Sequence, residues 1–119
     1  MHITRATERP YQDAGAPGIE RGRIWGAALP GRGTASTAPA GVGHGVAIEF
    51  CRMMKNSLYA RHPHASWEQM FVVTGSLAVD GVELAAGDFA FTEPGEWHEV
   101  RALEDSVVLL SFGQAPVVS

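Results

Sequence analysis

The chain has 119 residues, a formal net charge of −4 and nine Lys and Arg residues that form no cluster. This size fits one domain, and the acidic balance argues against nucleic acid as a partner. No apolar run is long enough to span a membrane, and the single cysteine, Cys51, excludes an internal disulfide. The first residues lack the apolar core of a signal peptide, so we expect a cytoplasmic protein.

The first third of the chain differs in composition from the rest. Residues 30–45 are rich in Gly, Ala and Pro and show no hydrophobic period, which predicts a loop. This loop is interpreted either as a lid over a pocket or as a plain connector. Residues 24–29 are predicted to form a short strand before it. We therefore expect an N-terminal arm over residues 1–45, followed by the main fold over residues 46–119.

From Val46 onward, short β-rich segments alternate with turn signals. Asp80-Gly81 is typical of a tight hairpin turn, because both residues tolerate positive φ angles. Regularly spaced short strands with turn signals predict an all-β, antiparallel sandwich or barrel. The expected strands cover residues 46–54, 57–64, 69–74, 77–79, 82–84, 89–92, 97–101 and 106–112.

Three potential metal ligands lie within seven residues of one another. Side chains two apart on a strand point to the same face, so His62 and His64 are expected to share one target. Glu68 follows closely enough to be brought back to the same point by a short connection. Two imidazoles and a carboxylate favour a transition metal over Ca²⁺ or Mg²⁺.

These residues belong to a longer pattern that resembles the first motif of the cupin superfamily. That motif is glycine, five residues, His-x-His, three or four residues, Glu, six residues, glycine. His62, His64, Glu68 and Gly75 keep its spacing, and Asn56 replaces the leading glycine. Asn is a mild replacement, because it tolerates left-handed backbone geometry better than most residues.

A second stretch resembles the second cupin motif, in which a glycine, a Pro-x-Gly turn and a histidine follow in fixed order. Gly87, Gly95 and His98 fall at the expected positions. Glu93 stands where the motif has proline, with Pro94 next to it, and Ala102 replaces a final asparagine. The resemblance covers residues 46–112, is closest to small single-domain cupin-2-like proteins, and leaves residues 1–45 unmatched.

The resemblance implies a jelly-roll β-barrel or sandwich with a metal at its centre. His98 would be the fourth ligand beside His62, His64 and Glu68. One divalent transition metal per chain is expected, with Fe, Mn, Ni and Zn all possible. Cupins commonly pair through a sheet face, and Trp67 and Trp97 are expected to point outward, so a homodimer is predicted.

A metal inside a small barrel with apolar walls would suit a small organic substrate. Tyr59 and Glu96 are candidate catalytic residues that could move a proton. The expected function is a metal-dependent enzyme, with dioxygenase-type oxidation first and isomerase, lyase or cyclase chemistry next. The alternative is a non-catalytic sensor or storage barrel that binds a small molecule. The expected walls of the substrate pocket are Phe50, Met54, Met70, Val72, Phe89, Phe91 and Val100.

Overall fold

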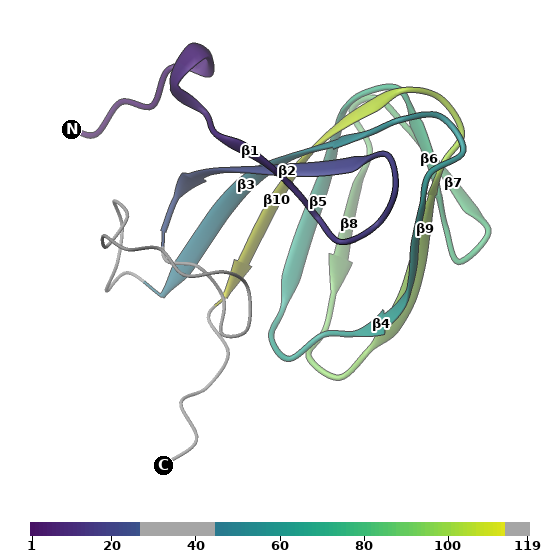
Figure 1. The fold of residues 1–119 in the computed structure, drawn as a ribbon. Coiled ribbons are helices and arrows are strands. Elements are labelled where there is room, and N and C mark those ends of the chain that lie inside the picture. The colour runs from purple at the N-terminus through teal and green to yellow at the C-terminus, as the bar shows by residue number, and fades with distance from the viewer. Residues whose placement is uncertain (27–44, 114–119) are drawn as a thin grey trace.

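In a computed structural model, two antiparallel β-sheets face each other (Figure 1). The structure describes residues 1–26 and 45–113. The six-stranded sheet has the order β1-β2-β3-β10-β5-β8, and the four-stranded sheet has the order β4-β9-β6-β7. The strands are β1 (Tyr11–Asp13), β2 (Ile19–Trp25), β3 (Val46–Met53), β4 (Leu58–Pro63), β5 (Glu68–Thr74), β6 (Ser76–Val79), β7 (Val82–Ala85), β8 (Phe89–Thr92), β9 (Trp97–Ala102) and β10 (Ser106–Gly113).

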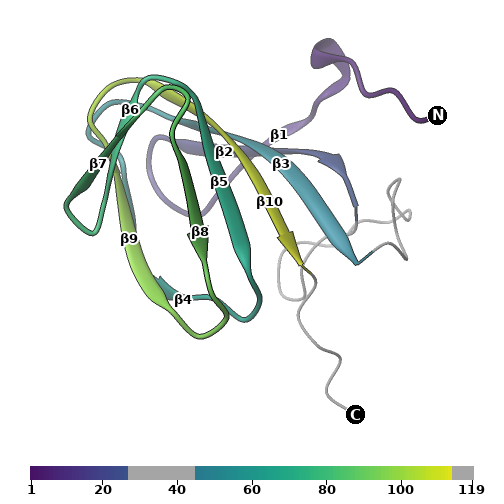
Figure 2. The same cartoon turned by 180° about the vertical axis from the view of Figure 1, so that it is seen from behind.

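The all-β antiparallel prediction is confirmed, and the eight strands from β3 onward lie close to their predicted positions. The two sheets form a sandwich in which the edge strand β8 lies beside β5 (Figure 2). Asn56 has a φ of 69°, which is the left-handed geometry expected of the residue that replaces glycine. Asp80 and Gly81 both have positive φ and join β6 to β7 as a hairpin, as predicted.

The N-terminal segment takes a larger part in the fold than its composition indicates. A short 3₁₀ turn, η1 (Ala6–Glu8), precedes β1, and β2 pairs with β3 from Ile19↔Met53 to Trp25↔Ile48. The boundary expected at residue 45 thus falls between two strands of one sheet. Most of the predicted loop, residues 30–44, lies outside the described residues.

The hydrophobic core lies between the sheets and follows the alternation of the strands. Every second residue of β3, β9 and β10 is buried, because side chains two apart point to the same face. No helix in the described ranges is long and apolar enough to cross a membrane. The buried apolar side chains are Ile19, Ala47, Cys51, Met53, Met70, Val72, Leu77, Val100, Ala102, Val108, Leu110 and Phe112.

Candidate metal centre and pocket

Three histidines from the four-stranded sheet meet between the sheets. His62 lies on β4, His64 follows directly after that strand, and His98 lies on β9, opposite His62 in the strand register. One ligand atom from each ring lies within 4.8 Å of the others, and the rings of His64 and His98 are 4.2 Å apart between centroids. The three side chains could hold a metal ion.

Glu68 reaches the same point from the opposite sheet, at the start of β5. Its Oε1 lies 3.5 Å from Nε2 of His64 and 3.9 Å from Nε2 of His98. The two sheets therefore bring together the four side chains that are expected as ligands. A carboxylate from one sheet and imidazoles from the other also link the two layers at this point.

Backbone hydrogen bonds orient two of the imidazoles. Nδ1 of His64 donates to the carbonyl oxygen of Glu96 at 2.9 Å, and Nδ1 of His62 donates to the carbonyl oxygen of Ala60 at 2.7 Å. Such bonds fix the ring and make Nε2 the nitrogen that carries the lone pair, which is the arrangement of histidines that bind metals. Nε2 of His64 is buried and has no hydrogen-bond partner within residues 1–26 and 45–113. A metal ion would satisfy this atom, so the residues fit the ion that the cupin resemblance implies.

The surroundings of the site raise the pKa of His64 and lower the pKa values of Glu68 and His98. Burial lowers the pKa of His64, but the contact with Glu68 and the bond to the Glu96 carbonyl outweigh burial and raise the pKa above 6.5. Burial would raise the pKa of Glu68, yet the neighbouring His64 holds it below its ordinary value. Burial, followed by repulsion from His64, lowers the pKa of His98. His64 and Glu68 thus favour each other's charged forms, whereas the surroundings of His98 favour its neutral form.

A bulge in β4 brings Tyr59 onto the same side as the histidines. Tyr59 pairs with Val100 and His62 pairs with His98, so β4 has one residue more than β9 between these pairs. Simple alternation would turn Tyr59 and His62 to opposite faces. With the bulge, both side chains line the pocket, and their rings lie 4.7 Å apart.

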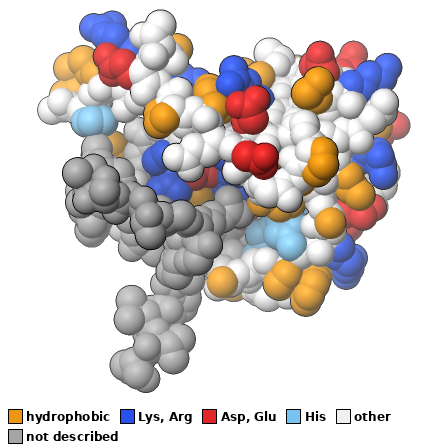
Figure 3. All heavy atoms as spheres, in the orientation of Figure 1, with side chains coloured by type: hydrophobic (Ala, Val, Ile, Leu, Met, Phe, Trp, Pro, Cys, Tyr) orange, Lys and Arg blue, Asp and Glu red, His pale blue; other side chains and the backbone are white. Residues whose placement is uncertain are grey.

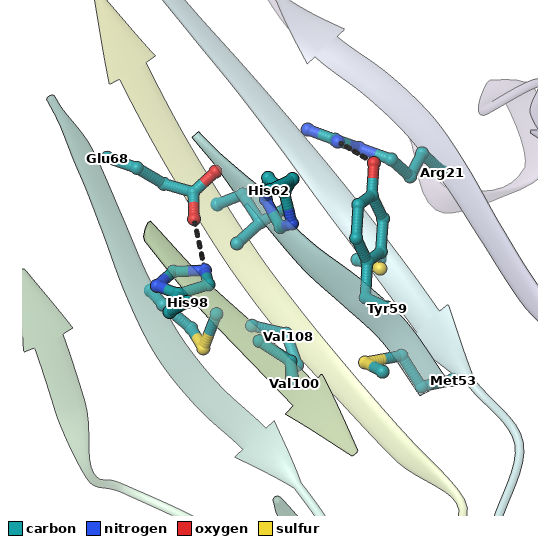
Figure 4. A pocket seen from close by; sticks show the side chains of 11 residues that line it. Arg21, Met53, Tyr59, His62, Glu68, His98, Val100 and Val108 are labelled. Atoms are coloured by element: carbon teal, nitrogen blue, oxygen red, sulfur yellow. Dashed lines mark hydrogen bonds and ion pairs between the residues drawn. The ribbon is translucent and has the colours of Figure 1, made fainter. Parts of the chain in front are cut away.

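The metal centre opens into a pocket between the sheets. The space is about 360 Å³, part of which is open to solvent. Figure 4 shows Arg21 and Tyr59 on one side, Glu68 and His98 on the other, and His62 between them. Histidine side chains reach the surface on this face of the molecule (Figure 3). The lining residues are Arg21, Cys51, Met53, Tyr59, His62, Glu68, Met70, His98, Val100, Val108 and Leu110.

Of the expected apolar walls, Met70 and Val100 line this pocket, and Val72 lies in the core without lining it. The expectation was wrong for the others. Phe89 and Phe91 are 55% and 45% exposed, because β8 turns Ala90 and Thr92 inward instead. Met54 is also exposed, since it follows the end of β3.

The structure also differs from the expectations for Phe50 and Glu96. Phe50 points away from the pocket, because Glu49 and Cys51 occupy the inward face of β3, and the guanidinium of Arg9 covers its ring. The side chain of Glu96 is exposed, and its Oε1 accepts a hydrogen bond from the backbone N–H of Glu93. Glu96 thus contributes its carbonyl oxygen to His64, and its carboxylate does not line the pocket.

Sequence reasoning missed the charged part of the pocket. Arg21 is 8% exposed and lies on β2, in the segment that matched no motif. The signal was present but weak: Arg21 is in phase with the apolar Ile19, and Glu49 is in phase with the buried Cys51 on the next strand. Cys51 is buried and also borders the pocket.

Comparison with known families and structures agrees with this architecture. The family model of the ChrR cupin-like domain matches residues 40–117, and the chain therefore belongs to this family of cupins. A search of curated proteins finds no match to this chain.

Solved structures show the same fold at low sequence identity. An RmlC-like cupin from Shewanella frigidimarina is 22% identical with a TM-score of 0.74, covering 97% of this chain and 92% of its own. KdgF from Halomonas sp. is 23% identical with a TM-score of 0.72, covering 98% and 96% respectively. An acetylacetone dioxygenase from Acinetobacter johnsonii is 14% identical with a TM-score of 0.68, covering 95% and 72%.

Proposed function

We propose that this chain is a metal-dependent cupin enzyme that acts on a small organic molecule. The observation that carries the proposal is the convergence of three imidazoles and one carboxylate on the wall of a largely apolar pocket. A metal site that opens into a pocket is typical of reactive centres, whereas structural sites are closed. Apolar walls with a few placed polar groups are typical of pockets for small organic ligands.

His62, His64, His98 and Glu68 would hold one divalent transition metal, Fe, Mn, Ni or Zn. When bound, such a metal polarises a carbonyl oxygen or, if it is iron, supports chemistry with dioxygen. Four protein donors leave positions free on a five- or six-coordinate ion. The donor set therefore supports a reactive role for the ion.

The remaining pocket residues would bind and shield the substrate. Met70, Val100 and Leu110 give an apolar wall that excludes water from the reacting atoms. The hydroxyl group of Tyr59 lies in the same pocket and could hold or move a proton. Dioxygenase-type oxidation is our first candidate, in line with the acetylacetone dioxygenase among the structural neighbours. Isomerase, lyase or cyclase chemistry is the second, because the cupin fold hosts several reactions.

The experiment compares metal content and turnover in the purified protein. After reconstitution with Fe²⁺, Mn²⁺, Ni²⁺ or Zn²⁺, oxygen consumption is measured with acetylacetone and related small diketones. Oxygen uptake that requires Fe²⁺ and is lost in His98→Ala would support the dioxygenase, and turnover unchanged by removal of oxygen would support the isomerase, lyase or cyclase group. Tight ligand binding without turnover, with the same affinity in His98→Ala, would contradict the enzyme proposal and support a non-catalytic binding barrel.

We also propose that the chain forms a homodimer. Exposed aromatic side chains support this, since such residues are enriched at interfaces. Phe71, Phe89 and Phe91 lie on the outer face of β5 and β8, where the ring of Trp67 stacks on Phe91. Trp97 is 52% exposed on β9. Sedimentation of the wild type against Phe89→Glu tests the proposal: a dimer that dissociates in the variant supports this face, and a monomeric wild type contradicts it.

A further inference from the structure

A buried guanidinium borders the pocket on the side away from Glu68 and His98. Arg21 comes from β2, and its side chain is 8% exposed. Its Nε donates to Oε1 of Glu49, and its Nη1 donates to the hydroxyl oxygen of Tyr59 at 3.3 Å (Figure 4). A guanidinium has five N–H donors, and within the part of the chain that the structure describes these two bonds use two of them. Arg21 thus has donors left for a ligand in the pocket.

The cluster around Arg21 retains a positive charge. Glu49 also accepts hydrogen bonds from Arg23, whose Nε and Nη2 lie 2.9 and 2.7 Å from Oε2. One carboxylate therefore accepts hydrogen bonds from two guanidinium groups. Glu49 neutralises only one of the two positive charges, and Glu68, the other carboxylate that lines the pocket, lies against His64 and His98. The pocket side of the Arg21 cluster therefore favours an anion.

A purely structural role explains Arg21 poorly. Arg23 already holds Oε2 of Glu49 with two hydrogen bonds, Arg21 adds one bond to Oε1, and Arg23 does not line the pocket. Arg21 instead lies among the apolar side chains that line the same pocket, including Cys51 and Met53. Burying a charge in such surroundings costs free energy, and apolar residues in place of buried ion pairs are often equally stable. The position of Arg21 is therefore better explained by binding than by stability.

We infer that Arg21 anchors the carboxylate of the substrate, so that the pocket takes a small organic anion. The guanidinium fork matches a carboxylate in two parallel hydrogen bonds, a geometry that Lys cannot reproduce. The inference rests on the proposed function for the other end of the substrate, which would carry the oxygen atom directed toward the histidines. Tyr59 bonds to Arg21 and lines the pocket, so it can contact both the anchor and the ligand.

The test measures binding of butyrate and of its neutral isostere butyramide by isothermal titration, with and without one equivalent of Zn²⁺. The wild type should bind butyrate at least about tenfold more tightly than butyramide, because charge-assisted hydrogen bonds are about twice as strong as neutral ones. Arg21→Met should remove this preference. Arg23→Met is the comparison variant: it removes one positive charge from the same cluster but no donor from the pocket, so it should reduce the preference less than Arg21→Met does.

The outcomes separate this inference from the proposed function. Equal affinity for the two probes in the wild type, or equal losses in Arg21→Met and Arg23→Met, would overturn the anchor even if the protein binds Zn²⁺. A preference that depends on Arg21 in a protein that binds no metal would keep the anion site and overturn the metalloenzyme. If Arg21→Met does not fold, Arg21→Lys replaces it: this variant keeps the charge but loses the fork, and unchanged butyrate affinity in it would contradict the anchor.

Discussion

Nε of Arg21 lies 2.5 Å from Oε1 of Glu49, and both side chains are buried between the sheets. This pair joins β2 to β3 and places a charge beside the pocket. Without Glu49, two guanidiniums would remain in this region with no carboxylate between them. The relationship therefore has consequences for stability as well as for ligand binding.

Replacing Glu49 by Gln should destabilise the fold strongly. Removal of one partner from a buried ion pair costs about 3–5 kcal/mol, because the remaining charge is left uncompensated. Glu20→Gln is the matched control, since Glu20 pairs with Arg52 at 3.3 Å and both side chains are about half exposed. Exposed pairs contribute about 0–1 kcal/mol. Urea unfolding of both variants measures the difference, and equal losses would contradict the buried role of Glu49.

Replacing His64 by Ala should weaken metal binding by well over about tenfold, because loss of an outer-shell partner alone costs about that much. Zn²⁺ affinity and metal content per chain measure the effect. His2→Ala is the control: His2 is exposed and its ring nitrogen is hydrogen-bonded to Thr4. Unchanged metal content in His64→Ala would contradict the assignment of the site.

The structure also distinguishes the backbone of Glu96 from its side chain. Glu96→Ala keeps the carbonyl oxygen that orients His64, so Zn²⁺ affinity should fall by much less than the about 10- to 100-fold that loss of an outer-shell partner costs. A loss as large as that of His64→Ala would show that the Glu96 carboxylate takes part in the site.

In the metal-free protein, the lowered pKa of Glu68 makes part of the stability depend on pH. The unfolded chain binds a proton on this carboxyl more readily than the folded protein does. The contribution of Glu68 is therefore present above its ordinary pKa of 4.5 and is lost as the pH falls through the lower folded value. His98, whose pKa is also lowered, adds to the loss below pH 6.5, whereas His64, whose pKa is raised, contributes stability below pH 6.5 and loses it at higher pH.

Urea unfolding with a chelator present tests the contribution of Glu68. The free energy of unfolding of the wild type should exceed that of Glu68→Gln at pH 6, and the difference should shrink toward pH 3. His64 and His98 lie close to Glu68, so their titration also changes in the variant, and the difference reports the charge of Glu68 together with its effect on both histidines. A difference that does not change with pH would show that Glu68 is not ionised differently in the folded state.

The sequence predicts this cluster well because three of its four residues lie within seven positions of one another. His62 and His64 lie two apart, and Glu68 begins the next strand, so alternation and a short turn are enough to bring them together. His98 lies far away in sequence, and its placement came from the resemblance to cupins. The cross-strand register of His62 and His98 then places both rings at one point.

The other residues that line the pocket are set by structural features that the alternation of side chains along a strand does not predict. The bulge in β4 changes the phase between Tyr59 and His62, and no residue type in that stretch marks it. On β8 the two apolar phenylalanines point outward, because the smaller Ala90 and Thr92 take the inward positions of this edge strand. Arg21 was missed because arginine rarely faces a core, and only the facing Glu49 makes it possible.

A comparison of Gly75 with Gly87 separates two costs of a side chain at a residue with positive φ, which are backbone strain and overlap with neighbouring atoms. Its φ is 86°, and a Cβ there would overlap Oγ of Ser106 and lie 2.5 Å from the carbonyl oxygen of Asp105. Ser106 cannot move without cost, because its Oγ donates to the carbonyl oxygen of Glu104 and accepts a hydrogen bond from the backbone N–H of Ser76. Gly87 has a similar φ of 93°, but a Cβ there would meet no described atom within 4 Å.

Gly87→Ala should therefore cost only the backbone strain, about 1–2 kcal/mol. Gly75→Ala should cost about 1–3 kcal/mol more, since overlap with packed atoms adds to the strain. Urea unfolding of the two variants measures the difference directly. Because the backbone strain is common to both, equal losses would show that the β5–β6 turn can shift away from Ser106 at little cost.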